Sequence, residues 1–539
     1  MRRSKQPWWK EAVFYHIYVR SFADSSGDGL GDIPGLISRL DYLNGGDNSL
    51  GVDALWLSPI YPSPDADFGY DVADYCDIDP RYGTLKDFDR LVKEAHKRGI
   101  RILMDLVFNH TSDQHPWFLE SRSSRDNPKR DWYIWRDPAR SKKPPNNWAS
   151  VFGGRAWEFD HQTGQYYLHM FVKQQPDLNW RNPEVPDALM DAVHFWIDHG
   201  VDGFRLDVFN LWYKDTDLKD NPPALGIRAF DRQKHVHDMD QPEMFPALKT
   251  FRSILDSAGE KTSVGELFGH DPALASSYCG NDKLHMVFNF EFSDCRFSPA
   301  AFRKAIQQWE SALQEDQWPC YVLSNHDMKR HITRYGNHPP DAVARITAAL
   351  LLTLRGTPFI YYGEEIGLPD TSLDRSRIVD PPGLRFWPLY KGRDSARCPL
   401  PWDDSAHGGF TDGQPWLPLY SGFEQLNVAL QQDDPDSILA FYRRLIQLRK
   451  EITALSQGEY RSLNNAAAAG MIYTRETKKQ QALIGLNFSA KSIYLNSSES
   501  LDPQDWQLVL SSNKEKKGST ADRGIYLNPY EAAVWVREN

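Results

Sequence analysis

Eight short apolar segments alternate with longer amphipathic segments along most of the chain, and this alternation restricts the possible folds more than any other feature. The apolar segments are predicted strands, at Val13–Val19, Val52–Ile60, Arg101–Phe108, Val201–Val208, Thr262–Leu267, Met286–Phe292, Cys320–Asn325 and Thr357–Glu364. Predicted helices separate most of them, for example Thr84–Arg98, Pro186–His199, Met244–Ala258, Pro299–Gln314 and Asp341–Leu354. Strands that alternate with helices form parallel sheets, and eight such units close into a barrel of ~250 residues plus insertions. We therefore predict an α/β fold, a (β/α)8 TIM barrel.

The rest of the sequence predicts three additions to this barrel. The barrel takes residues 1–109 and 181–454, and the intervening residues 110–180, rich in Asp, Pro, Asn and Trp, form an inserted lobe over its mouth. A second insertion runs from Gly367 to about Pro435, and its many Pro, Gly and Asp residues predict loops rather than regular structure. Residues 455–539 are predicted to form a C-terminal β-sandwich domain, because short alternating strands recur there, at Met471–Thr474, Gln481–Asn487 and Ala532–Val536.

The charge and the cysteines limit the partners and the compartment. Lys and Arg number 62 against 73 Asp and Glu, a net charge of −11, which disfavours nucleic acid and anionic membranes as partners and suits a neutral substrate. We expect no membrane span and no secretory signal, because no long apolar run exists and the basic start lacks an apolar stretch. Five cysteines without a CxxC pattern predict free thiols in the cytoplasm and argue against zinc. The oligomeric state cannot be inferred from the sequence.

Polar side chains follow four of the predicted strands at their C-terminal ends, where the reacting groups of such barrels gather. They are Asp105 and His110 at the end of the third strand, Arg205 and Asp207 at the end of the fourth, Glu266 at the end of the fifth, and His326 and Asp327 at the end of the seventh. A single carboxylate there is more often a helix cap or a rim ion pair. Four together repel one another and cost stability, so function explains them better. One ionised and one protonated carboxylic acid are the groups that glycoside hydrolysis requires.

Five motifs occur together in this chain. They are Asp105-Leu-Val-Phe-Asn-His110, Gln175-Pro-Asp-Leu-Asn179, Gly203-Phe-Arg-Leu-Asp-Val208, Val264-Gly-Glu266 and Asn325-His-Asp327. In this combination the sequence resembles the α-amylase superfamily of glycoside hydrolases, and more closely its branch of exo-acting α-glucosidases and oligo-1,6-glucosidases. The resemblance covers essentially the whole chain. It implies an enzyme that releases glucose from the non-reducing end of short α-glucosides, with a disaccharide or small oligosaccharide as substrate.

The resemblance also implies a role for each acid. Asp207 is the nucleophile that forms a β-glucosyl ester, and Glu266 is the general acid and later the base. Asp327 holds the 2- and 3-hydroxyls of the distorted sugar. Retention of configuration requires the carboxyl groups of Asp207 and Glu266 to lie ~5–5.5 Å apart. No metal or organic cofactor takes part in this chemistry.

The two working acids, Asp207 and Glu266, should differ in protonation state. Arg205 lies two residues before Asp207 on the same face of a strand, so its positive charge is expected to keep Asp207 ionised. Glu266 must hold a proton near neutral pH, and burial beside two other carboxylates would achieve this. We therefore expect a bell-shaped pH profile.

The sugar pocket is assigned by the resemblance. Asp67 accepts hydrogen bonds from hydroxyls at the non-reducing end, Tyr70 stacks under the glucose, and Arg393 pairs with Asp67 to close the far end. His110 and His326 donate to glucose hydroxyls. Phe152 and Phe171 line the entrance, although a purely structural role in the core is nearly as well supported for these two. A turn with a buried Tyr is the alternative for Asp67–Asp71.

The linkage preference stays open. In the resembling enzymes, Val at the position of Val208 accompanies α-1,6 preference, through steric shaping of the neighbouring subsite. One methyl group is worth only ~1–3 kcal/mol in such discrimination. The segments Lys219–Pro223 and Gln233–Asp238 are more similar to α-1,4-active or broad-range relatives, so the two signals disagree.

A calcium loop is predicted near the N-terminus. Oxygen-bearing side chains alternate with glycines over Asp24–Asp32, a spacing typical of calcium loops. The resemblance implies a structural Ca²⁺ held by Asp24, Ser26, Asp28, the carbonyl of Leu30, and Asp32, with Ser26 in place of the usual Asn or Asp. An Asx-rich turn without metal is the alternative.

Two other functions remain open. A transglycosylase or isomerase, of the sucrose isomerase or trehalose synthase type, would use the same acids and differ only in access of water to the glucosyl-enzyme. A non-catalytic interaction protein on this scaffold should lack one of the acids and carry a membrane span. This chain has all the acids and shows no such span.

Overall fold

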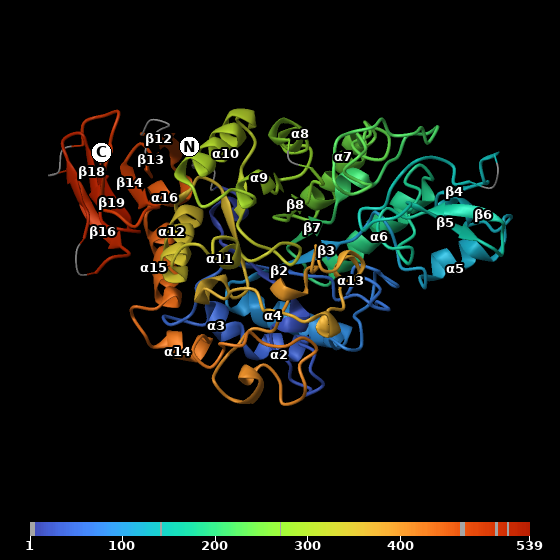
Figure 1. The fold of residues 1–539 in the computed structure, drawn as a ribbon, viewed down its shortest axis with the longest axis horizontal. Coiled ribbons are helices and arrows are strands. Elements are labelled where there is room, and N and C mark those ends of the chain that lie inside the picture. The colour runs from blue at the N-terminus through green and yellow to red at the C-terminus, as the bar shows by residue number, and fades with distance from the viewer. Residues whose placement is uncertain are drawn as a thin grey trace.

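The computed structural model describes residues 6–140, 143–269, 271–463, 469–501, 505–514 and 517–538. Met1–Lys5, on which the expected lack of a secretory signal partly depends, lie outside the described residues. Figure 1 shows the barrel in the middle of the molecule, with the inserted lobe at one end of the long axis and the C-terminal strands at the other.

The eight predicted parallel strands are present. They are β1 (Phe14–Ile17), β2 (Ala54–Leu57), β3 (Arg101–Leu106), β7 (Gly203–Leu206), β8 (Thr262–Gly265), β9 (Met286–Val287), β10 (Cys320–Val322) and β11 (Thr357–Tyr361). All pairs are parallel, in the order β10-β11-β1-β2-β3-β7-β8-β9. A parallel bridge between Phe288 and Cys320 joins the two ends of the sheet. The predicted TIM barrel is confirmed.

The predicted barrel helices are also confirmed, each to within two residues at either end. They are α4 (Leu85–Lys97), α6 (Glu184–Asp198), α7 (Met244–Ser257), α10 (Pro299–Ala312) and α12 (Pro340–Thr353). A capping box begins α4, because the Thr84 side chain accepts from the Asp87 backbone N–H while the Asp87 carboxylate accepts from the Thr84 N–H. The other helices of the barrel region are α1 (Trp8–Glu11), α2 (Ile33–Ser38), α3 (Leu40–Asn44), α8 (Pro272–Ser277), α9 (Phe290–Ser293), α11 (His331–Arg334), α15 (Ile438–Glu451) and α16 (Thr453–Gln457).

The inserted lobe follows β3 and carries its own small sheet. It contains α5 (Pro116–Ser123) and the antiparallel strands β4 (Trp135–Arg136), β5 (Trp157–Asp160) and β6 (Gln165–Leu168), in the order β4-β6-β5. An antiparallel bridge between His110 and Asp177 ties the end of the lobe back to the end of β3. The lobe therefore begins and ends beside the barrel mouth.

The second insertion is not only loop. It contains α13 (Pro381–Phe386) and α14 (Val428–Gln432), so the prediction of irregular structure throughout is wrong for these two segments. Their sequences carry ordinary helix starts: proline stands in the first turn of α13, and the Asn427 side chain accepts from the Leu430 backbone N–H at 2.9 Å. Such short helices are hard to separate from loops by periodicity alone.

The C-terminal region is all β, as predicted. A five-stranded antiparallel sheet has the order β12-β13-β14-β19-β16, and a three-stranded sheet has the order β15-β18-β17. The strands are β12 (Glu459–Ser462), β13 (Gly470–Glu476), β14 (Gln480–Asn487), β15 (Ile493–Asn496), β16 (Gln507–Ser511), β17 (Ser519–Ala521), β18 (Gly524–Leu527) and β19 (Ala532–Glu538). A buried cluster that includes Ile472, Leu483, Ile525 and Leu527 packs the two sheets together.

Two further features bear on the sequence predictions. None of the five cysteines forms a disulfide, and Cys279, Cys320 and Cys398 are buried. Within the described ranges, we find no helix with the length and apolar content that crossing a bilayer requires.

Candidate active site

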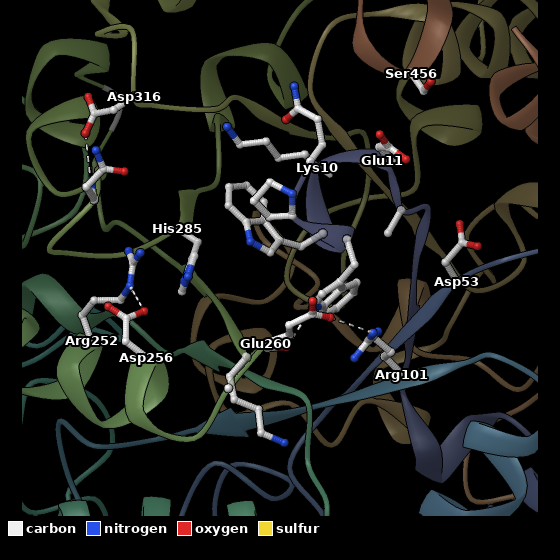
Figure 2. A pocket seen from close by; sticks show the side chains of 18 of the residues that line it. Lys10, Glu11, Asp53, Arg101, Arg252, Asp256, Glu260, His285, Asp316 and Ser456 are labelled. Atoms are coloured by element: carbon white, nitrogen blue, oxygen red, sulfur yellow. Dashed lines mark hydrogen bonds and ion pairs between the residues drawn. The ribbon is translucent and has the colours of Figure 1, made fainter. Parts of the chain in front are cut away.

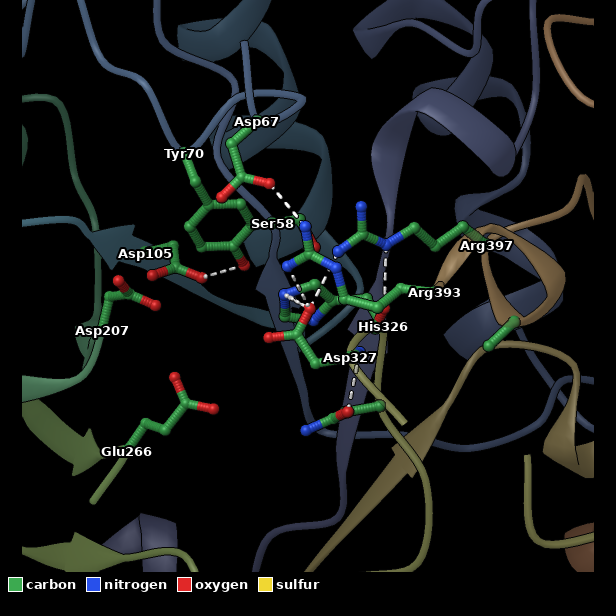
Figure 3. Close-up of polar contacts among 12 residues, drawn as sticks. Ser58, Asp67, Tyr70, Asp105, Asp207, Glu266, His326, Asp327, Arg393 and Arg397 are labelled. Carbon is green, nitrogen blue, oxygen red and sulfur yellow. Dashed lines mark hydrogen bonds and ion pairs between the residues drawn. The ribbon is translucent and has the colours of Figure 1, made fainter. Parts of the chain in front are cut away.

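Four acids from separate strands meet at one rim of the barrel. Asp105 lies in β3, whereas Asp207, Glu266 and Asp327 follow the ends of β7, β8 and β10. Figure 3 shows Asp207 and Glu266 on one side of the cluster, with Asp327 opposite them. Because the C-terminal ends of barrel strands share one rim, residues distant in sequence come together here.

One arginine serves three of these acids. The Arg205 guanidinium is fully buried and donates to Asp105 Oδ1 at 2.7 Å, to Asp207 Oδ1 at 2.6 Å, and through its other nitrogen to Glu266 Oε2. The ring of Trp56 lies 5.0 Å from its central carbon and adds a cation–π contact. The acids therefore hold a fixed arrangement around a permanent positive charge.

Burial sets the protonation of the pair formed by Asp207 and Glu266. Burial raises the pKa of Glu266 to about 8, with Arg205 opposing and the charges of Asp207 and Asp327 adding to the rise. Burial also raises the pKa of Asp207, to about 7, although Arg205 opposes it. Arg205 thus favours the ionised form of Asp207, as expected, but loss of solvent has the larger effect on this pKa, because the arginine is shared among three acids. Glu266 remains the member that holds its proton more tightly.

Asp327 has the opposite environment. Its Oδ1 accepts from Arg393 at 3.1 Å and from Arg397 at 2.8 Å. Burial raises the pKa of Asp327, but His326 and these two guanidinium groups outweigh it and hold the pKa well below its usual range. Asp327 therefore stays charged throughout the neutral range.

An ion-pair network surrounds Arg393 in the site. Arg393 donates to Asp67 Oδ1 at 2.5 Å and to Asp380 Oδ1 at 2.7 Å, in addition to Asp327. Gln175 of the inserted lobe donates to Asp67 Oδ2 at 3.2 Å. The predicted Asp67–Arg393 contact is therefore present, and two groups that were not in the predicted site fix it in place.

Ten of the twelve residues predicted for catalysis or sugar binding line one cavity of about 480 Å³. They are Asp67, Tyr70, His110, Phe152, Phe171, Asp207, Val208, Glu266, Asp327 and Arg393. Arg205 and His326 do not line it, because both are fully buried behind its wall. Tyr70 also contacts one of the four acids, because its hydroxyl donates to Asp105 Oδ2 at 3.1 Å.

The two histidines predicted to bind the sugar have different surroundings. His326 stacks on Tyr70 with ring centroids 5.1 Å apart, and its Nε2 lies 3.5 Å from Asp327 Oδ1. Burial lowers the pKa of His326 to about 3, although the charge of Asp327 opposes this shift. His110 lines the cavity, but its Nε2 already lies 3.0 Å from the Tyr70 carbonyl oxygen. His326 thus contacts both Tyr70 and Asp327, and donation from the two histidines to glucose hydroxyls stays a prediction.

Val208 is held in a strained conformation next to Asp207. Its φ of 32° and ψ of 44° place it in the left-handed region, which a β-branched residue rarely adopts. The turn of the chain after β7 forces this conformation and directs the Val208 side chain to the cavity wall. Strain of this kind is typical of functional sites.

The loop predicted to bind calcium is folded by its own side chains. Asp24 accepts hydrogen bonds from the backbone N–H groups of Ser26 at 2.8 Å and Gly29 at 2.8 Å. Asp32 accepts from the Gly35 N–H at 2.6 Å and caps α2. In the part of the chain that is described, no group of three or more His, Cys, Asp or Glu is arranged to hold a metal ion. The geometry fits an Asx-rich turn, and calcium stays a prediction.

A larger cavity, of about 660 Å³, lies at the other end of the barrel (Figure 2). It is lined by residues that precede the barrel strands, such as Ala12 and Asp53. Its labelled arginines are already paired, since Arg252 donates to Asp256 at 2.8 Å and Arg101 lies 3.5 Å from Glu260. Reacting groups of TIM barrels come from the opposite face, so this cavity is not the candidate site.

The sequence matches a known protein family over the segment that contains the four acids. Residues 16–458 match the family model described as alpha amylase, catalytic domain. The chain belongs to the α-amylase family.

Members of this α-amylase family are similar to the chain over nearly its full length. A probable alpha-glucosidase of Rhizobium meliloti (strain 1021) is 45% identical and covers 84% of each chain. An oligo-1,6-glucosidase of Parageobacillus thermoglucosidasius is 40% identical and covers 98% of each. The alpha-glucosyl transfer enzyme XgtA is 41% identical in sequence, and its crystal structure matches this one with a TM-score of 0.93. The match covers 99% of this chain and 100% of that one. The protein is thus a glycoside hydrolase of the α-amylase family with α-glucosidase relatives.

Sequence reasoning missed several residues of this α-amylase-family site. Asp380 and Arg397 lie in the second insertion, where no regular pattern marks them, although Arg397 stands only four residues after Arg393. Asp105 and Gln175 belong to motifs that were recognised, but nothing in the sequence showed which groups they contact. Their partners become visible only when the chain is folded.

Proposed function

We propose that this protein is a retaining exo-α-glucosidase, which releases α-glucose from the non-reducing end of short α-1,4- or α-1,6-glucosides. The observation that carries the proposal is the arrangement of one cavity. Asp207 and Glu266 line it together, and the Asp67–Arg393 pair, which also lines it, would block its far end. A blocked end leaves room for one terminal glucose.

The first half of the reaction forms an ester. The Asp207 carboxylate attacks the anomeric carbon as the glycosidic bond breaks, and Glu266 gives its proton to the departing oxygen. The raised pKa of Glu266, caused chiefly by burial, supports this role as the acid. A carboxyl separation of ~5–5.5 Å between the two remains a prediction of the retaining mechanism.

The second half restores the enzyme. Glu266, now ionised, takes a proton from water, and the water oxygen attacks the anomeric carbon and releases Asp207. Two inversions at one carbon leave α-glucose. Asp327, kept charged by Arg393 and Arg397, accepts from sugar hydroxyls and stabilises the positive charge that develops on the ring.

The proposal is tested by following the anomeric form of the product. Maltose and isomaltose, incubated with the wild-type enzyme, should release α-glucose before mutarotation, as followed by proton NMR. Glu266→Gln should lose at least ~100-fold in kcat on both substrates, whereas Leu119→Ser, an exposed position elsewhere, should not change it. Initial release of β-glucose, or full activity of Glu266→Gln on maltose, would exclude the mechanism.

A second candidate function is glucosyl transfer or isomerisation. The similarity to the alpha-glucosyl transfer enzyme favours this alternative, because transfer uses the same acids and only replaces water by another hydroxyl. Product analysis with sucrose, maltose and trehalose at high substrate concentration distinguishes free glucose from transferred glucose.

We also propose a structural Ca²⁺ in the loop Asp24–Asp32, on the spacing of its oxygen-bearing residues. Asp24 and Asp32 would have to turn from backbone N–H groups to the ion. After treatment with EDTA, 1 mM CaCl2 should raise the melting temperature by about 3 °C. Asp28→Ala should abolish the rise, because it removes one proposed carboxylate ligand; in the loop this exposed side chain also accepts from the Leu30 backbone N–H at 2.8 Å. An unchanged melting temperature would exclude the ion.

A cytoplasmic location is proposed from the five unpaired cysteines. Cell fractionation with an antibody against the chain tests it, and recovery outside the cytoplasm would refute it.

A further inference from the structure

Arg393 makes more hydrogen bonds to an acid outside the cavity than to the two acids that line the cavity with it. Nη1 donates to Asp327 and Nη2 to Asp67, and in Figure 3 the guanidinium lies between these two acids, away from Glu266. Nε and Nη2 also donate to Asp380 Oδ1, at 2.9 and 2.7 Å, and the backbone N–H donates to Asp380 Oδ2 at 2.9 Å. Asp380 is fully buried and does not line the cavity, so it contacts Arg393 without facing a sugar.

The Asp380 carboxylate serves Arg393 and not its own helix. Asp380 is the N-cap residue of α13, a position where Asp commonly accepts from a backbone N–H of the first turn. Its side chain forms no such bond, and α13 begins with Pro381 and Pro382, which have no N–H to donate. Burial raises the pKa of Asp380, but Arg393 and Arg397 outweigh it and hold the pKa below its usual range. A buried charge is therefore committed to Arg393.

The backbone around this ion pair is packed without spare room. Gly392, the residue before Arg393, has a φ of 83°, and a Cβ there would lie 2.5 Å from Asp380 Oδ2. A Cβ at Gly383 of α13 would lie 2.9 Å from the Cα of Gly392. Side chains do not tolerate such distances, so the two glycines let α13 lie directly against the segment that carries Arg393.

The other end of α13 contacts the inserted lobe beside Arg393. The central guanidinium carbon of Arg393 lies 4.8 Å from the centroid of the Phe152 ring, in a cation–π contact. The next residue, Gly153, has a φ of 94°, and a Cβ there would lie 2.6 Å from the Phe386 ring and 2.7 Å from Arg385 Nε. The helix thus holds Arg393 through a carboxylate at its start and is packed at its end against the turn that carries Phe152.

We infer that Asp380 is a positioning residue that decides specificity: it fixes Arg393 across the far end of the cavity and so restricts the enzyme to terminal glucose. This inference rests on the proposed function, in which Arg393 and Asp67 close that end. Asp67 and Asp327 also accept from sugar hydroxyls in the proposed cycle, whereas Asp380 keeps its three bonds to Arg393 whether the cavity is empty or filled. Without Asp380, the flexible arginine turns aside and a longer glucose chain passes through the opened end.

The test uses two chromogenic substrates. p-Nitrophenyl α-glucoside fits the closed pocket. p-Nitrophenyl α-maltoside, with its terminal 4- and 6-hydroxyls blocked by an ethylidene group, releases nitrophenol only if its blocked glucose lies beyond the far end. The wild-type enzyme should cleave the first and not the second. Asp380→Ala should raise KM for the glucoside about tenfold and change kcat less than about threefold, because hydrogen bonds to a charged group are lost. It should also release nitrophenol from the blocked maltoside.

Two further variants serve as controls. Asp380→Asn keeps the size of the side chain and one acceptor oxygen, so it should raise KM for the glucoside only about threefold. Asp374→Ala removes an exposed acid of the same insertion, six residues earlier, and should behave as the wild type on both substrates. Melting temperatures show which variants fold.

The outcomes separate the inference from the proposed function. A folded Asp380→Ala that releases no nitrophenol from the blocked maltoside would overturn the inference alone. If Asp380→Ala does not fold, Asp380→Asn decides: a raised KM with kcat retained supports the inference, and a wild-type KM overturns it. A wild-type enzyme that cleaves the blocked maltoside, or that cleaves neither p-nitrophenyl α-glucoside nor maltose, would overturn both.

Discussion

At the scale of single residues, the chemistry depends on how three acids share Arg205. Because burial raises the pKa of both working acids, the free enzyme has a narrow range in which Asp207 is ionised and Glu266 is protonated. The values of about 7 and about 8 place this range slightly above neutral pH. Burial, opposed by the shared arginine, therefore sets the pH range of activity.

We predict that kcat/KM for maltose follows a bell-shaped profile with its maximum between pH 7 and 8. Below this range, protonation of Asp207 removes the nucleophile, and above it Glu266 loses the proton that the leaving oxygen needs. Initial rates from pH 5 to 10 measure the profile. Glu266→Gln should abolish the alkaline limb on a 2,4-dinitrophenyl α-glucoside, whose leaving group needs no proton. A wild-type profile that stays level up to pH 10 would contradict the assignment.

The positions of the catalytic acids could largely be predicted from the sequence, but the groups that contact them could not. Asp207, Glu266 and Asp327 follow apolar strands, so their position at the rim could be inferred from the barrel pattern alone. Asp380, in contrast, accepts from Arg393 across a segment without periodicity, and no local signal marks it. The stacking of His326 on Tyr70 is equally a matter of tertiary packing.

At the scale of elements, the inserted lobe is held to the barrel by a buried ion pair. Lys214, after β7, lies 2.9 Å from Asp177 of the lobe, and both side chains are buried. Lys214 also donates to Asn109 Oδ1 at 3.0 Å, next to the end of β3. Asp177 stands two residues after Gln175, so this ion pair also positions the contact of the lobe with Asp67.

We predict that Lys214→Met lowers the free energy of unfolding by about 3–5 kcal/mol, because it leaves the Asp177 charge buried without a partner. The double variant Lys214→Met, Asp177→Asn should recover part of this loss, since an amide oxygen can still accept from the Met170 N–H. Urea unfolding followed by tryptophan fluorescence measures both. A double variant less stable than the single variant would show that the ion pair is not the cause.

Strands and helices of the barrel could be predicted because their burial leaves a periodic pattern in the sequence. The capping box that begins α4 even gives its first residue. The short helices α13 and α14 could not, because one or two turns carry too little periodicity to compete with the surrounding proline and glycine. β17 is likewise only three residues long, too short to show a clear alternation in the sequence.

At the scale of the whole molecule, the C-terminal sheets share the core of the barrel. One continuous apolar core includes Leu350 of α12 and Ile484 of β14. Arg475 of β13, fully buried, donates to the Thr353 carbonyl oxygen at 2.7 Å, and Arg303 of α10 donates to the Gly470 carbonyl oxygen at 2.7 Å. The C-terminal strands therefore cover the face of the barrel that α10 and α12 form, and this face is not exposed to solvent.

We therefore predict one cooperative unfolding transition for the full chain, rather than one for each domain, in differential scanning calorimetry. A chain cut after Gly458 exposes the apolar groups that face β13 and β14, and should be recovered mainly as aggregate. Two separate transitions, or a stable and monomeric truncated chain, would show that the C-terminal domain is energetically independent.

The single guanidinium beneath the acids has one more consequence for the proposed cycle. When the ester forms, Asp207 gives up its negative charge at the same step in which Glu266 acquires one. When water cleaves the ester, the two exchanges run in reverse. Arg205 thus faces the same total charge before, during and after each turnover, so neither half of the cycle requires an ion to enter or leave the barrel.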